Sequence, residues 1–146
     1  MTEDTLQVEG APARIPASRI WRAGLIAIVV SVAANVALLW LVVRIVDISP
    51  DFPPMQAGPI AFLTAVGGLL ATVTYLIITR ISKRPVRTFW IVAIIALLIS
   101  LVPDIGGVIS PESVPVPGAT ATAFLALMIF HVVAAVIDVL ILTRLS

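Results

Sequence analysis

The sequence predicts an all-α membrane protein, a four-helix antiparallel bundle in which each helical span crosses the bilayer. Its 146 residues are 60% hydrophobic and only 12% charged, and the mean hydropathy is +1.16. A soluble core of this length cannot bury so much apolar surface, so the bilayer is the natural solvent. Four long apolar segments follow one another, and a basic turn from Arg80 to Arg87 divides them into two hairpins.

The N-terminal segment is predicted to be a polar tail that leads into the first span. Residues 1–18 carry three acids and little apolar periodicity, which is typical of a disordered cytoplasmic tail. The first span is predicted over residues 20–46, because residues 23–43 alone give about 30 Å of helix. A secretory signal is the competing interpretation, since Arg14, Arg19 and Arg22 precede the apolar run that starts at Ala23. The apolar run continues to Val43, which favours an uncleaved anchor.

The other three spans are bounded by proline-rich loops and by the basic turn. The second is predicted over residues 59–79, with a proline at its start, where a missing N–H costs nothing. The third is predicted over residues 88–109 but meets Pro103 after about 22 Å of helix, which is short for about 30 Å of hydrocarbon. Either this helix kinks and continues to Ile109, or neighbouring helices shield it from lipid. The fourth span, residues 119–143, carries His131 and Asp138.

The distribution of basic residues predicts the orientation. With the N-terminus inside, eight Lys and Arg residues are cytoplasmic and Arg44 alone is outside, which is a strong positive-inside signal. The outer loops then hold Asp47, Asp51, Asp104 and Glu112. We therefore expect a multi-pass protein of the bacterial inner membrane with both termini in the cytoplasm. Anionic lipid headgroups, rather than nucleic acid, are the expected contacts of the basic side chains Arg80, Lys83, Arg84 and Arg87.

The two halves of the chain share an internal repeat. Ile48-Ser49-Pro50-Asp51 corresponds to Ile109-Ser110-Pro111-Glu112, and Leu76 to Arg80 corresponds to Leu140 to Arg144. Apolar helices also have identical residues at many positions because of their similar composition, so chance similarity is the alternative interpretation. A true repeat would make the bundle two parallel-repeat hairpins, related by an axis along the membrane normal.

Three sets of residues are predicted near the middle of the membrane: Asn35, the pair Gly67 and Gly68, and His131. An amide and an imidazole in hydrocarbon need partners, so we expect a hydrogen bond between Asn35 and His131, with the two glycines allowing close backbone approach. A purely structural contact between helices is one interpretation. A proton-relay or ligand-binding site is another, and a third is tetrapyrrole or metal ligation by His131.

Asp138 is predicted to lie two turns beyond His131 on the same helix face. Intramembrane acids are candidates for function by default. This one is close enough to the cytoplasmic end to pair instead with Arg22, Arg84 or Arg87, which would make it structural or interfacial. Ser31, Thr74 and Tyr75 are predicted at similar depth and could solvate the carboxylate.

Three short stretches carry a resemblance to a known family: Arg87-Thr88-Phe89, Ser100 to Asp104, and His131 to Ala135. They resemble a family of small four-helix bacterial membrane proteins classed as a domain of unknown function. The similarity extends from about Arg22 to Leu142 and implies a four-span inner-membrane protein. It offers no activity, substrate or catalytic residue, and Asp138 lies outside the shared pattern.

The sequence therefore predicts a protein that is not an enzyme. It contains no Walker loop, HExxH or GxSxG motif, and without cysteine it has no disulfide or thiolate site. No cofactor is expected. The leading prediction is a structural or accessory subunit that packs against a membrane-protein partner or another copy of itself. The alternatives are an oligomeric proton-coupled transporter or channel-like factor, and a pigment- or haem-binding subunit that uses His131.

Overall fold

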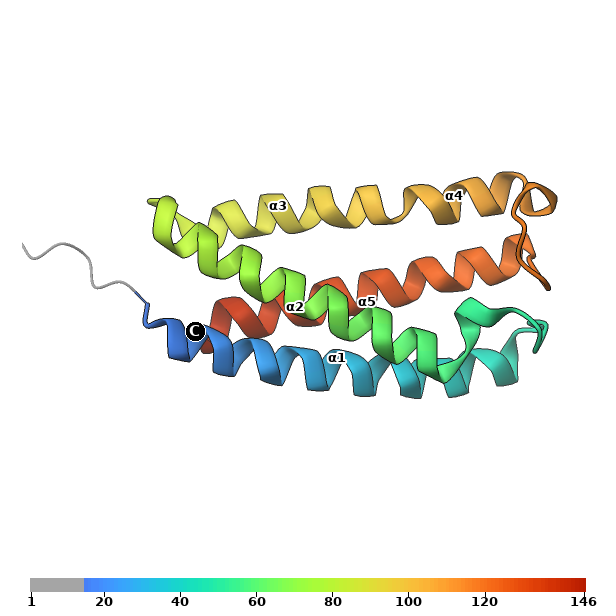
Figure 1. Cartoon of the computed structure of the whole chain (residues 1–146), viewed down its shortest axis with the longest axis horizontal. Helices are drawn as coiled ribbons and strands as arrows, with labels where there is room; N and C mark the ends of the chain where they lie inside the picture. Colours follow the sequence, from blue (N-terminus) through green and yellow to red (C-terminus); the bar gives the residue numbers. More distant parts are fainter. Residues whose placement is uncertain (1–14) are drawn as a thin grey trace, which may run out of the picture.

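The structure, a computed structural model, describes residues 15–146. This part of the chain is helical and contains no strand (Figure 1). The helices are α1 (Ala17–Ile45), α2 (Ala57–Ile81), α3 (Pro85–Ser100), α4 (Val102–Ile109) and α5 (Ala121–Leu145), with short 3-10 helices η1 (Pro53–Met55) and η2 (Pro111–Ser113). α1 begins at Ala17, so the last two residues of the predicted tail are helical, and residues 1–14 lie outside the described residues.

Within residues 15–146 four helical segments are long and apolar enough to cross a membrane, which makes this a multi-pass integral membrane protein. They are α1, α2, α5 and the combined α3 and α4, whose 25 residues from Pro85 to Ile109 form one span. Neighbouring spans run antiparallel and are joined by short loops at the two ends (Figure 1). The predicted fold class is therefore confirmed.

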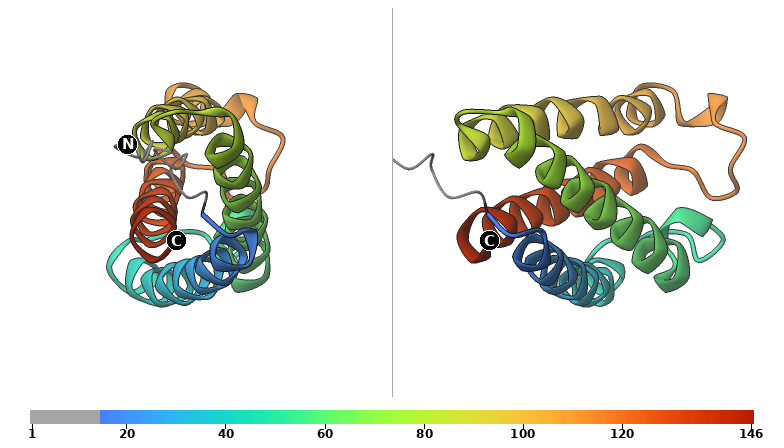
Figure 2. Two further views of the ribbon diagram at one scale, coloured as in Figure 1. Left: turned by 90° about the vertical axis from the view of Figure 1, so that its left-hand side faces the viewer. Right: turned by 60° about the vertical axis from the view of Figure 1, so that its left-hand side comes forward.

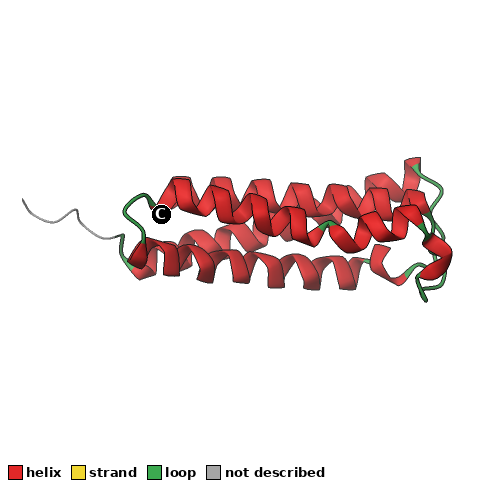
Figure 3. Ribbon diagram, turned by 90° about the horizontal axis from the view of Figure 1, so that it is seen from above, coloured by secondary structure: helices red, strands yellow, loops and turns green. Residues whose placement is uncertain are grey.

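The third span is interrupted at Leu101, where α3 gives way to α4 (Figure 3). Pro103 is the second residue of α4 and has no N–H to continue the hydrogen-bond ladder of α3. The helix resumes at once and ends at Ile109. Of the two interpretations of the third span, the structure agrees with the helix that continues past Pro103 to Ile109.

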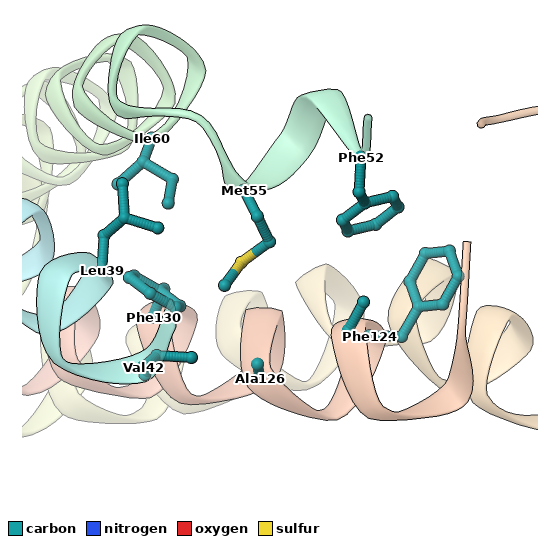
Figure 4. Packing of buried hydrophobic residues seen from close by; sticks show 9 residues of the cluster. Leu39, Val42, Phe52, Met55, Ile60, Phe124, Ala126 and Phe130 are labelled. Atoms are coloured by element: carbon teal, nitrogen blue, oxygen red, sulfur yellow. The ribbon is translucent and has the colours of Figure 1, made fainter. Parts of the chain in front are cut away.

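The core of the bundle has an apolar cluster at each end. The basic end holds the start of α1, the turn between α2 and α3, and the end of α5 (Figure 1). Its cluster consists of Ile20, Ala23, Tyr75, Ile78, Phe89, Val139 and Leu142. The opposite end, here the loop end, has a cluster of Leu39, Val42, Phe52, Met55, Ile60, Ala123, Phe124, Ala126 and Phe130. Figure 4 shows Phe52 and Met55, from the loop after α1, above the aromatic side chains of α5.

α1 makes the most extensive contacts in the bundle, with α2 and α5. Its buried residues recur every three or four positions, as expected for a helix with one packed face: Ile20, Ala23, Gly24, Ala27, Ser31, Asn35, Leu39 and Val42. α3 lies diagonally opposite α1 in the view along the bundle (Figure 2). Only one of its residues, Phe89, is buried.

Candidate functional site: an intramembrane groove

A layer of polar side chains separates the two apolar clusters. Ser31 donates a hydrogen bond to Asp138 across α1 and α5, with 2.7 Å between the oxygens. Thr72 donates to the carbonyl oxygen of Gly68 within α2, also at 2.7 Å. Because no water is available in the bilayer interior, these internal partners are what make such groups tolerable there.

Asn35 of α1 is 1% exposed and lies in the same polar layer. Its Nδ2 donates to Oγ1 of Thr64 at 3.0 Å and to the carbonyl oxygen of Phe130 at 3.2 Å. The predicted hydrogen bond from Asn35 to His131 is therefore wrong, because the amide donor faces the residue before His131. The amide oxygen, Oδ1, is buried and has no hydrogen-bond partner.

His131 faces Asp104 instead. Its Nε2 lies 3.3 Å from Oδ2 of Asp104, an ion-pair distance, although this oxygen makes no hydrogen bond. We expected Asp104 in an outer loop, and this is wrong: it is 7% exposed and belongs to the first turn of α4. The sequence analysis did not identify Asp104 as a site residue, because it left open whether the third helix continues past Pro103. The apolar run that resumes at Ile105 was the available signal.

Asp138 is 4% exposed. Of the partners considered for it, Ser31 is the one that binds. No ion pair joins it to Arg22, Arg84 or Arg87 among the described residues. Tyr75 instead accepts a hydrogen bond from Ser146 at the end of α5. The carboxylate thus lies inside the bundle, between α1 and α5, and not among the basic side chains.

The two predicted close-packing glycines behave differently. A Cβ at Gly68 would come within 2.7 Å of Ile28 in α1, so this glycine permits close contact between α1 and α2. A Cβ at Gly67 would meet nothing within 4 Å, so the prediction is wrong for this residue. Gly24, which the sequence did not single out, also permits close approach, since a Cβ there would collide with Thr72.

A groove of about 570 Å³ runs between α2, α3 and α5. Asn35, Asp104, His131 and Asp138 all line it, so one cavity borders several polar residues of the bundle. Much of its wall consists of small residues from three helices: Gly67, Ala71, Ala93, Ala96, Ala134 and Ala135. Thr74 lines it as well. The side chain of His131 is 43% exposed, so the imidazole is accessible beside the groove.

The four basic side chains of the turn, Arg80, Lys83, Arg84 and Arg87, are all exposed. The turn itself spans residues 82–84 and is closed by Ser82, whose hydroxyl accepts from the backbone N–H of Arg84 and bonds with the hydroxyl of Thr88. Arg19 at the start of α1 donates to the carbonyl oxygen of Leu145, which joins the two described ends of the chain.

The structure places one acid, Asp104, beside His131 but does not complete a set of metal ligands there. Within residues 15–146 no three His, Asp or Glu side chains come together in a group that could hold a metal ion. Nε2 of His131 is the ring nitrogen that faces Asp104. The candidate site is therefore the groove as a whole and not His131 alone.

Comparison with known proteins agrees with the architecture. No curated protein and no solved structure matches the chain. Residues 15–146, the same range that the structure describes, match the family of unknown function DUF6069. The match covers nearly the whole chain and includes the stretches on which the resemblance rested. This four-span integral membrane protein belongs to that family.

Proposed function

We propose that the protein is a non-enzymatic membrane protein that binds a lipid-like molecule of the bilayer in the groove between α2, α3 and α5. The groove is the observation that carries this proposal. Its volume of about 570 Å³ falls within the range of about 300–1,000 Å³ that is typical of small-molecule sites. Its wall is mostly apolar with a few polar side chains, which is also typical of such sites.

Contacts at both ends hold the groove open. At the basic end Phe89 of α3 packs against Tyr75 of α2, with 4.7 Å between the ring centroids. At the loop end α4 lies so close to α5 that a Cβ at Gly107 would collide with the ring of Phe124. Between these two contacts small side chains face one another and leave space. The groove is thus part of the fold and needs no movement of α3 to form.

The connections between the helices support a non-enzymatic role. They comprise residues 46–56, 82–84 and 110–120. These short segments leave little surface outside the bilayer on which a water-soluble substrate could be bound.

The proposed location is the bacterial inner membrane, with both termini in the cytoplasm. All described basic residues except Arg44 lie at the basic end, and the acids Asp47, Asp51 and Glu112 lie at the loop end. This charge asymmetry supports the orientation. The chain lacks cysteine, so Lys83→Cys and Ser113→Cys can be labelled individually in intact cells. Labelling of Lys83→Cys alone by an impermeant thiol reagent would contradict the proposed orientation.

An accessory subunit of a larger membrane complex is the second candidate. It is favoured by the loose packing of the third span, of which 11% is buried, against 28% for each of the other three. The groove itself does not suit a partner helix. A helix about 10 Å wide that crosses about 30 Å displaces on the order of 2,000 Å³, several times the cavity. A partner would therefore pack on the outside of α3.

The test is purification in mild detergent, followed by extraction and mass spectrometry of bound lipid-like molecules. We expect about one such molecule per protein, and its loss in Gly67→Phe, because this side chain would occupy the groove. Val66→Phe, at the neighbouring exposed position outside the groove, is the matched control. Equal recovery of bound molecules from both variants would reject the groove as the binding site. A co-purifying membrane protein at one-to-one ratio in both variants would support the accessory role.

A further inference from the structure

The polar groups of the groove are not evenly distributed. Asn35, Asp104 and His131 gather toward the loop end, near Phe124 and Phe130, and we call these three residues the acceptor cluster. His131 and Asp104 are 3.3 Å apart, and Asn35 bonds to the carbonyl of the residue that precedes His131. The cluster therefore joins α1, α4 and α5 at one level of the bundle.

Two oxygen atoms of the acceptor cluster are buried without a hydrogen bond. They are Oδ1 of Asn35 and Oδ2 of Asp104, on side chains that are 1% and 7% exposed. An unsatisfied polar atom in hydrocarbon is costly, and native proteins leave few of them. Both atoms are acceptors, so a hydrogen-bond donor would satisfy them. Neighbouring side chains cover both oxygens, and a donor in the groove would reach them only after those side chains move.

The rest of the groove is suited to an apolar chain. From the acceptor cluster toward the basic end its wall is formed by apolar side chains, among them Leu70, Val92, Ala93 and Phe89. Along α5 the distance from His131 to Val139 is eight residues, about 12 Å. Asp138 interrupts this apolar wall, but its Oδ1 already accepts a hydrogen bond from Ser31.

We propose that the acceptor cluster is a head-group site, and that the groove selects single-chain amphiphiles whose head group donates hydrogen bonds. This inference rests on the proposed function and names the class of ligand. A hydroxyl or a primary amine has the required donor. An ammonium head would in addition pair with the Asp104 carboxyl group in its ionised form, next to His131, so long-chain alcohols and amines share the predicted chemistry.

Three probes of equal chain length test the selection on the unaltered protein: hexadecanol, hexadecylamine, and methyl hexadecyl ether, whose head can only accept. Binding to the full-length protein in detergent would be measured by native mass spectrometry and by displacement of a fluorescent lipid. We expect the alcohol, the amine or both to bind about tenfold more tightly than the ether, the difference expected for one buried hydrogen bond. Tighter binding of the amine would identify a cationic head group, and tighter binding of the alcohol a neutral one.

The failures of the two proposals differ in this experiment. Equal binding of all three probes would overturn the head-group site and leave the apolar groove standing. Absence of binding by all three would overturn both proposals.

A pair of variants locates the selection at Asp104. Asp104→Asn removes the negative charge but keeps an acceptor oxygen, so we expect amine binding to weaken about tenfold while alcohol binding changes little. Asp51→Asn, at an exposed acid of the loop end, is the matched control and should change neither. Unchanged amine binding in Asp104→Asn, for a protein that prefers the amine, would contradict the assignment.

Discussion

Small residues allow close helix packing on one side of this bundle, between α1 and α2, which we call the closed side. On the open side, beside α3, small residues line a groove instead. Between α1 and α2, Gly24 and Gly68 allow contacts so close that an added Cβ would collide with the opposing helix. Beside α3, Gly67 and a set of alanines face an open groove. In a bilayer, close packing and interhelical hydrogen bonds drive association, because lipid is as apolar as the side chains. A small residue therefore stabilises the bundle only where another helix comes close enough to use it.

The polar residues that line the groove differ in whether they have a hydrogen-bond partner. Where α1, α2 and α5 pack closely, Ser31 is bonded to Asp138, and Nδ2 of Asn35 to Thr64. The buried oxygens that lack a hydrogen bond, on Asn35 and Asp104, belong to residues that line the groove. Asp138 and Thr64 also line the groove, but each has a hydrogen-bond partner on α1, whereas Oδ1 of Asn35 and Oδ2 of Asp104 are buried without one.

The largest effect should come from filling the closed side. Gly68→Val would force a side chain against Ile28, where overpacking costs about 1–3 kcal/mol. Gly67→Val, one residue away, has open space and should be nearly neutral. Thermal unfolding in detergent, followed by circular dichroism, measures both. Equal destabilisation by the two variants would break the distinction between the closed and the open side.

A smaller effect should come from releasing α3 at the basic end. Phe89→Ala removes the aromatic contact with Tyr75, and such a pair contributes on the order of 1 kcal/mol beyond the burial of the ring itself. Ile91→Ala changes an exposed side chain of the same helix and serves as the control. Distances between spin labels on α3 and α5 would be measured in both variants. We expect a broader distribution in Phe89→Ala alone, and an unchanged one would show that Phe89 does not anchor α3.

The smallest effect should come from the hydrogen bond between Ser31 and Asp138. Interhelical hydrogen bonds in membranes contribute about 0.6 kcal/mol on average and up to about 2 kcal/mol. A double-mutant cycle with Ser31→Ala and Asp138→Asn should give a coupling energy in this range, measured by unfolding in mixed micelles. A coupling near zero would mean that the carboxylate is stabilised from the groove and not by α1.

Much of the site was predictable residue by residue, but its partners were not. Asn35, His131 and Asp138 stood out because polar groups are rare in such apolar spans. Their pairing depends on how each helix is rotated about its axis. One residue position corresponds to about 100° of rotation, and the helix face that meets Asn35 is that of Phe130, whose carbonyl accepts its hydrogen bond, and not that of His131. Sequence spacing does not determine that rotation.

The sequence by itself determined the class of protein, the four spans and the charge asymmetry, because hydrophobic length and the distribution of Lys and Arg act locally and additively. The family follows from sequence as well. Only the tertiary structure decided that Asp104 is buried opposite His131, that Gly68 packs while Gly67 does not, and that α3 leaves a groove. These features depend on contacts between helices distant in sequence. In a bilayer such contacts are determined by shape and hydrogen bonding between helix faces, and they cannot be predicted from hydropathy.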